Sequence, residues 1–121
     1  MTGRTVTVAT NDHGDVTLPE PAWCRGLHPA EAYRVDIAHE GEETLALIPT
    51  LCHGEAPTLT ASLIQRPFSP DRNGVVAALF IDGDWHELDS KLLDRAAAII
   101  VERAAELRHL ARQLAALEVT R

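Results

Sequence analysis

The C-terminal quarter of the chain constrains the fold most, because it lacks both of the residues that break helices. From Ser90 to about Leu117 there is neither Gly nor Pro, and Asp89 or Ser90 is a good N-cap. This pattern predicts a helix of about 28 residues with one apolar side roughly 160° wide. That side contains Leu92, Leu93, Ala96, Ala97, Ile99, Ile100, Ala104, Leu107, Leu110, Ala111, Leu114 and Leu117.

The predicted helix is too long for a compact domain of this size. At about 1.5 Å per residue it measures roughly 42 Å, whereas a compact chain of 121 residues has a diameter near about 35 Å. Its last turns would expose leucines unless a loop or a second copy covers them. We therefore expect a homodimer through the C-terminal helix, unless the helix bends or frays after Leu110. The expected interface consists of Arg103, Leu107, Leu110, Leu114 and Leu117, with Arg103 snorkelling or paired with an acid.

The residues before this helix favour an antiparallel sheet. Val75 to Ile81 and Trp85 to Leu88 flank Asp82-Gly83, which predicts a tight hairpin. Further strands are expected at 5–9, 16–18, 33–39, 44–51 and 58–65, with a loop from Pro19 to Ala32. We expect a single α+β domain over 1–121, in which about five to seven strands (1–89) pack on the helix (90–118).

Composition and charge exclude several classes of protein. The chain is 45% hydrophobic and 24% charged, which is typical of a folded soluble domain that can bury a core without a staple. A net charge of −7 argues against binding to phosphate backbones as the main task. No apolar run is long enough to span a bilayer, and the polar N-terminus lacks a signal-peptide pattern. We expect a cytoplasmic protein whose two cysteines, Cys24 and Cys52, stay reduced.

The loop after Pro19 and the segments that follow it hold residues that can ligate a metal. Cys24 is followed by His28, then by His39 and by Cys52-His53. Thiolates and imidazoles suit Zn²⁺, and four protein ligands would form a structural site. The predicted ligands are Cys24, His28, His39 and Cys52. The alternative is that His39 is a core-edge histidine and Cys24 a small buried apolar residue beside Trp23.

Four segments together resemble a known family. They are Pro21-Ala22-Trp23-Cys24-x3-His28, Val35-Asp36-Ile37-Ala38-His39-Glu40-Gly41, Ala61-Ser62-Leu63-Ile64-Gln65 and the Asp82-Gly83 hairpin that leads into an Ala/Leu helix. This pattern resembles the small uncharacterised actinobacterial, Streptomyces-type domains of unknown function. The resemblance covers most of the chain after about Pro19 and implies no activity. Its Trp-Cys-x3-His and Asp-x2-His elements correspond to Trp23, Cys24, His28, Asp36 and His39, whereas Cys52-His53 lies outside the pattern.

Sequence motifs of common enzymes are absent. There is no Gly-x-Ser-x-Gly, no P-loop, no Gly-x-Gly-x-x-Gly and no His-Glu-x-x-His. We therefore expect a non-enzymatic interaction module that is stabilised by zinc and binds a protein partner or itself. Two alternatives stay open: a small metal- or thiol-dependent enzyme that uses Cys24, His28 and His39, and an accessory regulator linked to nucleic acid.

Overall fold

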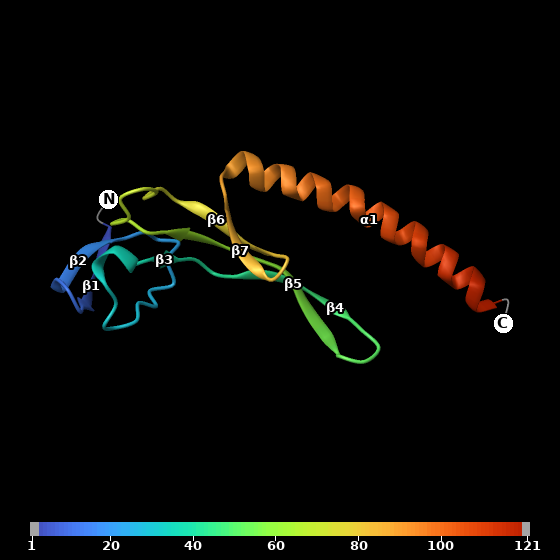
Figure 1. Cartoon of the computed structure of the whole chain (residues 1–121), viewed down its shortest axis with the longest axis horizontal. Helices are drawn as coiled ribbons and strands as arrows, with labels where there is room; N and C mark the ends of the chain where they lie inside the picture. Colours follow the sequence, from blue (N-terminus) through green and yellow to red (C-terminus); the bar gives the residue numbers. More distant parts are fainter. Residues whose placement is uncertain (1–2, 120–121) are drawn as a thin grey trace. The chain divides into compact units, whose positions relative to one another are not determined.

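The computed structural model describes residues 3–119 and divides the chain into two compact units (Figure 1). The first ends at Leu88 and contains antiparallel sheets of two and five strands, whereas the second begins at Asp89 and contains one long helix. The predicted α+β class, with about seven strands followed by a C-terminal helix, is confirmed. No helix in the described part of the chain is long and apolar enough to cross a membrane.

A hairpin of β1 (Arg4–Thr10) and β2 (Gly14–Glu20) forms the smaller sheet. The strand pair agrees with the prediction. The sequence predicts that a loop begins at Pro19, but β2 continues through Pro19 to Glu20. Proline is tolerated here because β2 pairs with one neighbour only, so the missing N–H need not serve a second strand. The extra two residues matter because they place Glu20 at the end of a paired strand.

The segment after the first hairpin is less regular than its alternating sequence indicates. The strand predicted over 33–39 is wrong: Arg34–Asp36 form the 3-10 helix η1, and only His39–Glu40 form a strand, β3. The Asp12 carboxylate accepts a hydrogen bond from the backbone N–H of Arg34 at 2.9 Å, which ties η1 to the turn between β1 and β2. This hydrogen bond joins residues that are 22 positions apart, and it outweighs the short alternation of apolar and polar residues in the sequence.

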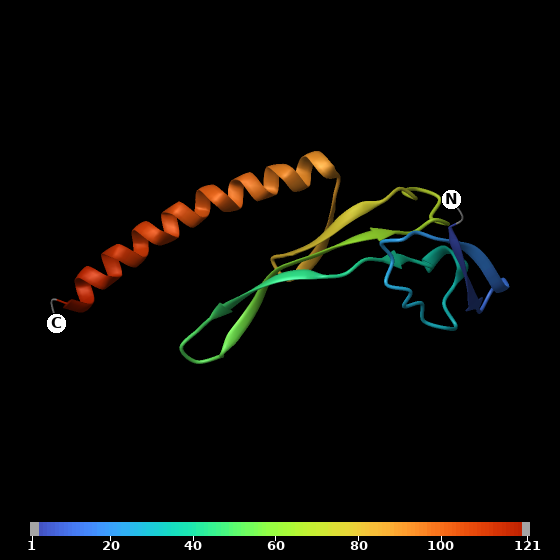
Figure 2. The same cartoon turned by 180° about the vertical axis from the view of Figure 1, so that it is seen from behind.

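The larger sheet is built around the long strand β5 (Glu55–Gln65). β3 and β4 (Thr44–Pro49) pair with β5, and β6 (Val76–Ile81) pairs with its other edge and with β7 (Asp84–Leu88). The predicted β6–β7 hairpin is confirmed, with Asp82 and Gly83 at φ of 54° and 81° as a two-residue turn requires. Seen from both sides, the tip of the β4–β5 hairpin lies away from β1 and β2 (Figures 1 and 2).

A small apolar cluster lies where the first hairpin meets the segment after η1. Val8, Leu18 and Ile37 are buried together, and Val6, Val16 and Phe68 pack against them. Alternation along an extended chain places Glu20 on the same side as Leu18, and His39 on the same side as Ile37. The apolar cluster therefore continues into two buried polar side chains, Glu20 and His39.

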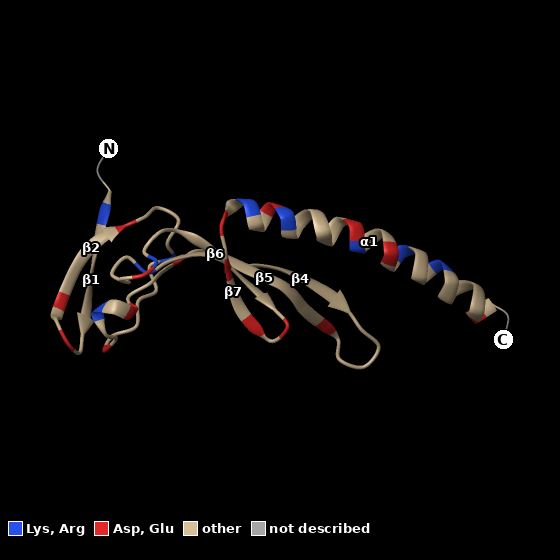
Figure 3. Cartoon of the chain, turned by 45° about the horizontal axis from the view of Figure 1, so that its top comes forward, with Lys and Arg blue, Asp and Glu red and all other residues tan. Residues whose placement is uncertain are grey.

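The second unit consists of α1 (Ser90–Val119), which agrees with the predicted helix. Asp89 is its N-cap, since its carboxylate accepts a hydrogen bond from the backbone N–H of Leu92 at 2.8 Å. None of the residues of α1 is buried. Arg103 pairs with Glu106 at 3.1 Å, which is one of the two arrangements that the sequence left open for it. Figure 3 shows acidic and basic residues interspersed along the helix.

Candidate metal centre

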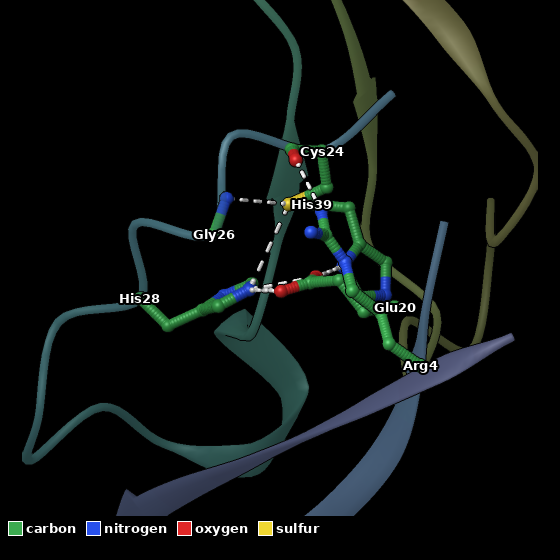
Figure 4. A network of polar contacts seen from close by, with 6 residues as sticks. All are labelled: Arg4, Glu20, Cys24, Gly26, His28 and His39. Carbon is green, nitrogen blue, oxygen red and sulfur yellow. Dashed lines mark hydrogen bonds and ion pairs between the residues drawn. The ribbon is translucent and has the colours of Figure 1, made fainter. Parts of the chain in front are cut away.

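Four side chains with metal-binding atoms converge beside the apolar cluster. They are Glu20, Cys24, His28 and His39, and one ligand atom of each lies within 4.8 Å of the others (Figure 4). Glu20 ends β2, Cys24 and His28 lie in the loop that follows, and His39 begins β3. The cluster therefore joins three segments of the first unit.

The carboxylate of Glu20 is the centre of the cluster. Its Oε1 atom lies 2.8 Å from Nδ1 of His39 and 2.9 Å from Nε2 of His28. Its Oε2 atom lies 3.1 Å from the same nitrogen of His28. The Sγ atom of Cys24 is 3.7 Å from Nε2 of His28. The nitrogen, oxygen and sulfur atoms of the four side chains thus contact one another within a few ångströms.

The cluster is almost fully shielded from solvent. The side chains of His28, Glu20 and His39 are 5%, 4% and 3% exposed, and Cys24 is buried as well. Burial of ionisable groups is costly unless each has a partner. In the described part of the chain, every buried side-chain nitrogen or oxygen has a hydrogen-bond partner. The convergence of these four residues is therefore a defined feature of the fold.

Backbone contacts in the loop fix the position of Cys24. The N–H of Cys24 donates to the carbonyl of Pro21 at 3.0 Å, which closes a tight turn. Gly26 adopts a φ of +80°, and its N–H donates to Sγ of Cys24 at 3.4 Å. Arg4 donates to the Cys24 carbonyl at 2.9 Å, and the N–H of Arg25 donates to the carbonyl of Glu40. Such contacts fix the position of a side chain that could ligate a metal.

Trp23 supports the cluster from the side of His39. The two rings meet edge to face, with centroids 6.3 Å apart. Gly41 makes room for Trp23, because a Cβ atom at Gly41 would lie 3.3 Å from the Trp23 carbonyl oxygen and 3.5 Å from its ring. A side chain at this position would therefore push the Trp23 backbone away by a few tenths of an ångström.

The surroundings move two pKa values in opposite directions. Burial alone would raise the pKa of Glu20, but hydrogen bonds with Cys24, His28 and His39 and the charge of His28 outweigh it, so this pKa is lowered. Burial raises the pKa of the Cys24 thiol, and the negative charge of Glu20 raises it further, against the lowering effect of the Gly26 N–H. Without a bound cation, Cys24 is therefore a neutral thiol at neutral pH.

Three of the four predicted ligands meet in this cluster, and the fourth does not. Cys24, His28 and His39 are brought together, whereas Cys52 is exposed at the tip of the β4–β5 hairpin. Glu20 takes the place that was expected for Cys52, and it was not among the predicted ligands. No local spacing identifies Glu20, because it lies at the end of a strand and not on a helix face, and it reaches the cluster through the pairing of β2 with β1.

Comparison with known proteins gives one match. A family model described as "Domain of unknown function (DUF6907)" matches residues 5–116. The matched range contains all four residues of the cluster and most of α1. No curated protein and no solved structure matches the chain.

Proposed function

Because the chain belongs to the DUF6907 family, whose description assigns no function, we propose a function from the residues themselves: a non-enzymatic, cytoplasmic interaction module that a structural zinc ion stabilises. One observation carries the zinc-binding part of this proposal, namely the convergence of Glu20, Cys24, His28 and His39 within 4.8 Å. We also propose that the Trp23-Cys24-x3-His28 element is a functional signature of the family. An actinobacterial origin stays a prediction.

The donor set selects the metal. One thiolate and two imidazoles favour zinc over magnesium or calcium, which prefer oxygen ligands. Around a tetrahedral zinc ion, neighbouring ligand atoms lie about 3.3–3.6 Å apart. Cys24 Sγ and His28 Nε2 are already 3.7 Å apart. The two contacts of Glu20 Oε1 with histidine, at 2.8 and 2.9 Å, need to lengthen by roughly half an ångström.

Charge balance supports a divalent cation. A thiolate at Cys24 and a carboxylate at Glu20 together carry two negative charges, and neutral His28 and His39 add none. A divalent cation therefore makes the buried site neutral, which avoids the large cost of an uncompensated buried charge. Because burial raises the pKa of Cys24, this thiol releases its proton when the metal binds.

The surrounding fold gives a zinc ion something to stabilise. The apolar cluster beside the site is built on three buried residues, Val8, Leu18 and Ile37. Small cores are commonly reinforced by a structural metal. An ion held by Glu20, Cys24 and His39 would tie β2, the following loop and β3 together. Four protein ligands leave no open position for a substrate or an activated water, so the role is structural.

A thiol-dependent enzyme is the second candidate. Its supporting observation is the 3.7 Å contact between Cys24 Sγ and His28 Nε2, which resembles a nucleophile beside its base. Nucleophilic cysteines are accessible and have lowered pKa values. Cys24 is buried, and its burial raises the pKa of the thiol. These properties favour a ligand over a nucleophile.

Native mass spectrometry of untagged protein, purified without chelator and supplied with equimolar zinc, tests the proposal. We expect one zinc ion per chain in the wild type and in Cys52→Ser. We expect its loss in Cys24→Ser. The two variants make the same chemical change at a buried and an exposed cysteine, so they are matched controls. A wild type that takes up no zinc, or a Cys24→Ser variant that retains it, would overturn the proposal.

A further inference from the structure

Eight positions of α1, seven of them apolar, follow a heptad spacing within its broad apolar side. Alternating steps of three and four residues connect Leu93, Ala96, Ile100, Arg103, Leu107, Leu110, Leu114 and Leu117, and we call these eight positions the helix seam. A repeat of 3.5 residues keeps a seam facing a partner helix, and it is the pattern of coiled coils. Only Arg103 departs from small or apolar character.

The seam is exposed over most of its length. Leu107, Leu110, Leu114 and Leu117 are 52%, 57%, 56% and 65% exposed. The charged residues of the helix other than Arg103 fall at positions outside the seam; they include Asp94, Arg95, Glu102, Arg108 and Arg112. One face of α1 is therefore suited to water and the other to a partner.

We propose that the helix seam pairs with the seam of a second copy of this chain in an antiparallel arrangement. This inference rests on the interaction role in the proposed function and names its partner. Each exposed seam leucine offers roughly 100 Å², so two seams, with Ile100 and their alanines, bury about 1,200 Å² in total. A specific interface needs about 1,000 Å², so the seam is large enough.

The position of Arg103 selects the antiparallel arrangement. In a parallel, in-register pair, Arg103 would face Arg103 of the second copy inside the apolar seam, and the two like charges would repel. In an antiparallel pair with full overlap, Arg103 faces Leu107 of the second copy. Glu106 of the second copy then lies beside Arg103, and this acid already pairs with Arg103 within one chain at 3.1 Å.

Side-chain size selects the same arrangement. Antiparallel overlap places Ala96 opposite Leu114, Ile100 opposite Leu110 and Leu93 opposite Leu117. A parallel pair would place Ala96 opposite Ala96, which leaves a gap between the helices. Seams pack best when small residues face large ones. Charge and volume therefore agree on one orientation.

Two matched substitutions test whether the seam is the interface. We expect Leu110→Glu to convert the dimer into a monomer in a light-scattering mass measurement at micromolar concentration. We expect Val101→Glu to stay dimeric, because Val101 is an exposed apolar residue of the same helix outside the seam. A monomeric wild type, with the seam covered by its own sheets or by nothing, would overturn the inference. So would a dimer that Leu110→Glu leaves intact.

Spin-label distances test the orientation. Ala105 and Ala116 lie off the seam, and each is replaced by a labelled cysteine in a Cys52→Ser background. In the antiparallel dimer, Ala116 aligns with Asp94 of the second copy, so the two labels are offset by about 33 Å along the axis. In a parallel dimer they are separated only by the width of the helix pair, about 20–25 Å. Ala105 lies near the antiparallel two-fold axis and gives a short distance in either case. A short distance at Ala116 would overturn the antiparallel arrangement.

The zinc content of the same samples separates this inference from the proposed function. The cluster of Glu20, Cys24, His28 and His39 lies in the first unit, whereas the helix seam lies in the second. A zinc-free dimer with a long Ala116 distance would refute the zinc proposal and leave the antiparallel dimer standing. A zinc-loaded monomer would refute the antiparallel dimer and leave the zinc proposal standing.

Discussion

Replacement of Cys24 by Ser separates metal binding from folding. Serine has the shape of cysteine and can accept the hydrogen bond that the Gly26 N–H donates to Sγ at 3.4 Å. The metal-free protein should therefore keep its fold. A serine hydroxyl is a poor zinc ligand, because it does not form the anion that a thiol forms when the metal binds. The substitution removes one of four ligands with little other change.

The expected magnitude follows from the number of ligands. Structural zinc sites contribute about 10–16 kcal/mol of binding free energy, or roughly 2.5–4 kcal/mol for each of four ligands. Loss of the Cys24 thiolate should therefore weaken zinc binding by roughly 100-fold or somewhat more. At a free zinc concentration 100 times the wild-type Kd, zinc stabilises the wild type by about 2.7 kcal/mol but the variant by about 0.4 kcal/mol.

Thermal unfolding followed by circular dichroism, with and without buffered zinc, measures this difference. For a unit of this size the wild type should gain about 10–20 °C in Tm with zinc, and Cys24→Ser about 2–3 °C. Cys52→Ser should behave as the wild type, because Cys52 is exposed and outside the cluster. An equal zinc-dependent gain in wild type and Cys24→Ser would refute the assignment of Cys24 as a ligand.

Three further outcomes are expected. Gly41→Ala should cost about 1–2 kcal/mol in urea unfolding, because its Cβ would lie 3.3 Å from a backbone oxygen. Gly74→Ala meets nothing within 4 Å, so an equal loss there would contradict this packing argument. A backbone hydrogen bond lowers the pKa of Asp12 in the folded state, so its stabilisation is complete above about pH 4 and is lost as the pH falls. The stability advantage of wild type over Asp12→Asn should therefore shrink in acid, and a constant difference would oppose this. Iodoacetamide at neutral pH should modify exposed Cys52 well before buried Cys24, as peptide mass spectrometry would report, whereas equal rates would favour a reactive thiol.

The parts of the fold that could be predicted depend on neighbouring residues alone. Helix α1 follows from a long segment without Gly or Pro behind the N-cap Asp89. The β6–β7 hairpin follows from Asp82-Gly83, since these residues adopt the positive φ angles of a tight turn. Such signals act within a few residues and do not depend on the rest of the chain.

The parts that were missed depend on contacts between distant segments. The alternation of Tyr33, Val35 and Ile37 predicts a strand. The carboxylate of Asp12 instead accepts a hydrogen bond from the backbone N–H of Arg34, which favours η1. Glu20 was missed for a related reason. Its flanking prolines predict a loop, and only the pairing of β2 with β1 turns its carboxylate toward two histidines.

X-ray absorption at the zinc K-edge tests the central claim most directly, because it reports the ligand shell itself. For zinc held by Glu20, Cys24, His28 and His39, we expect one sulfur at about 2.3 Å and three nitrogen or oxygen atoms at about 2.0–2.1 Å. Cys24→Ser should give no sulfur-containing zinc shell, whereas Cys52→Ser should give the shell of the wild type. A shell without sulfur, or one with more than one sulfur per zinc, would contradict this account.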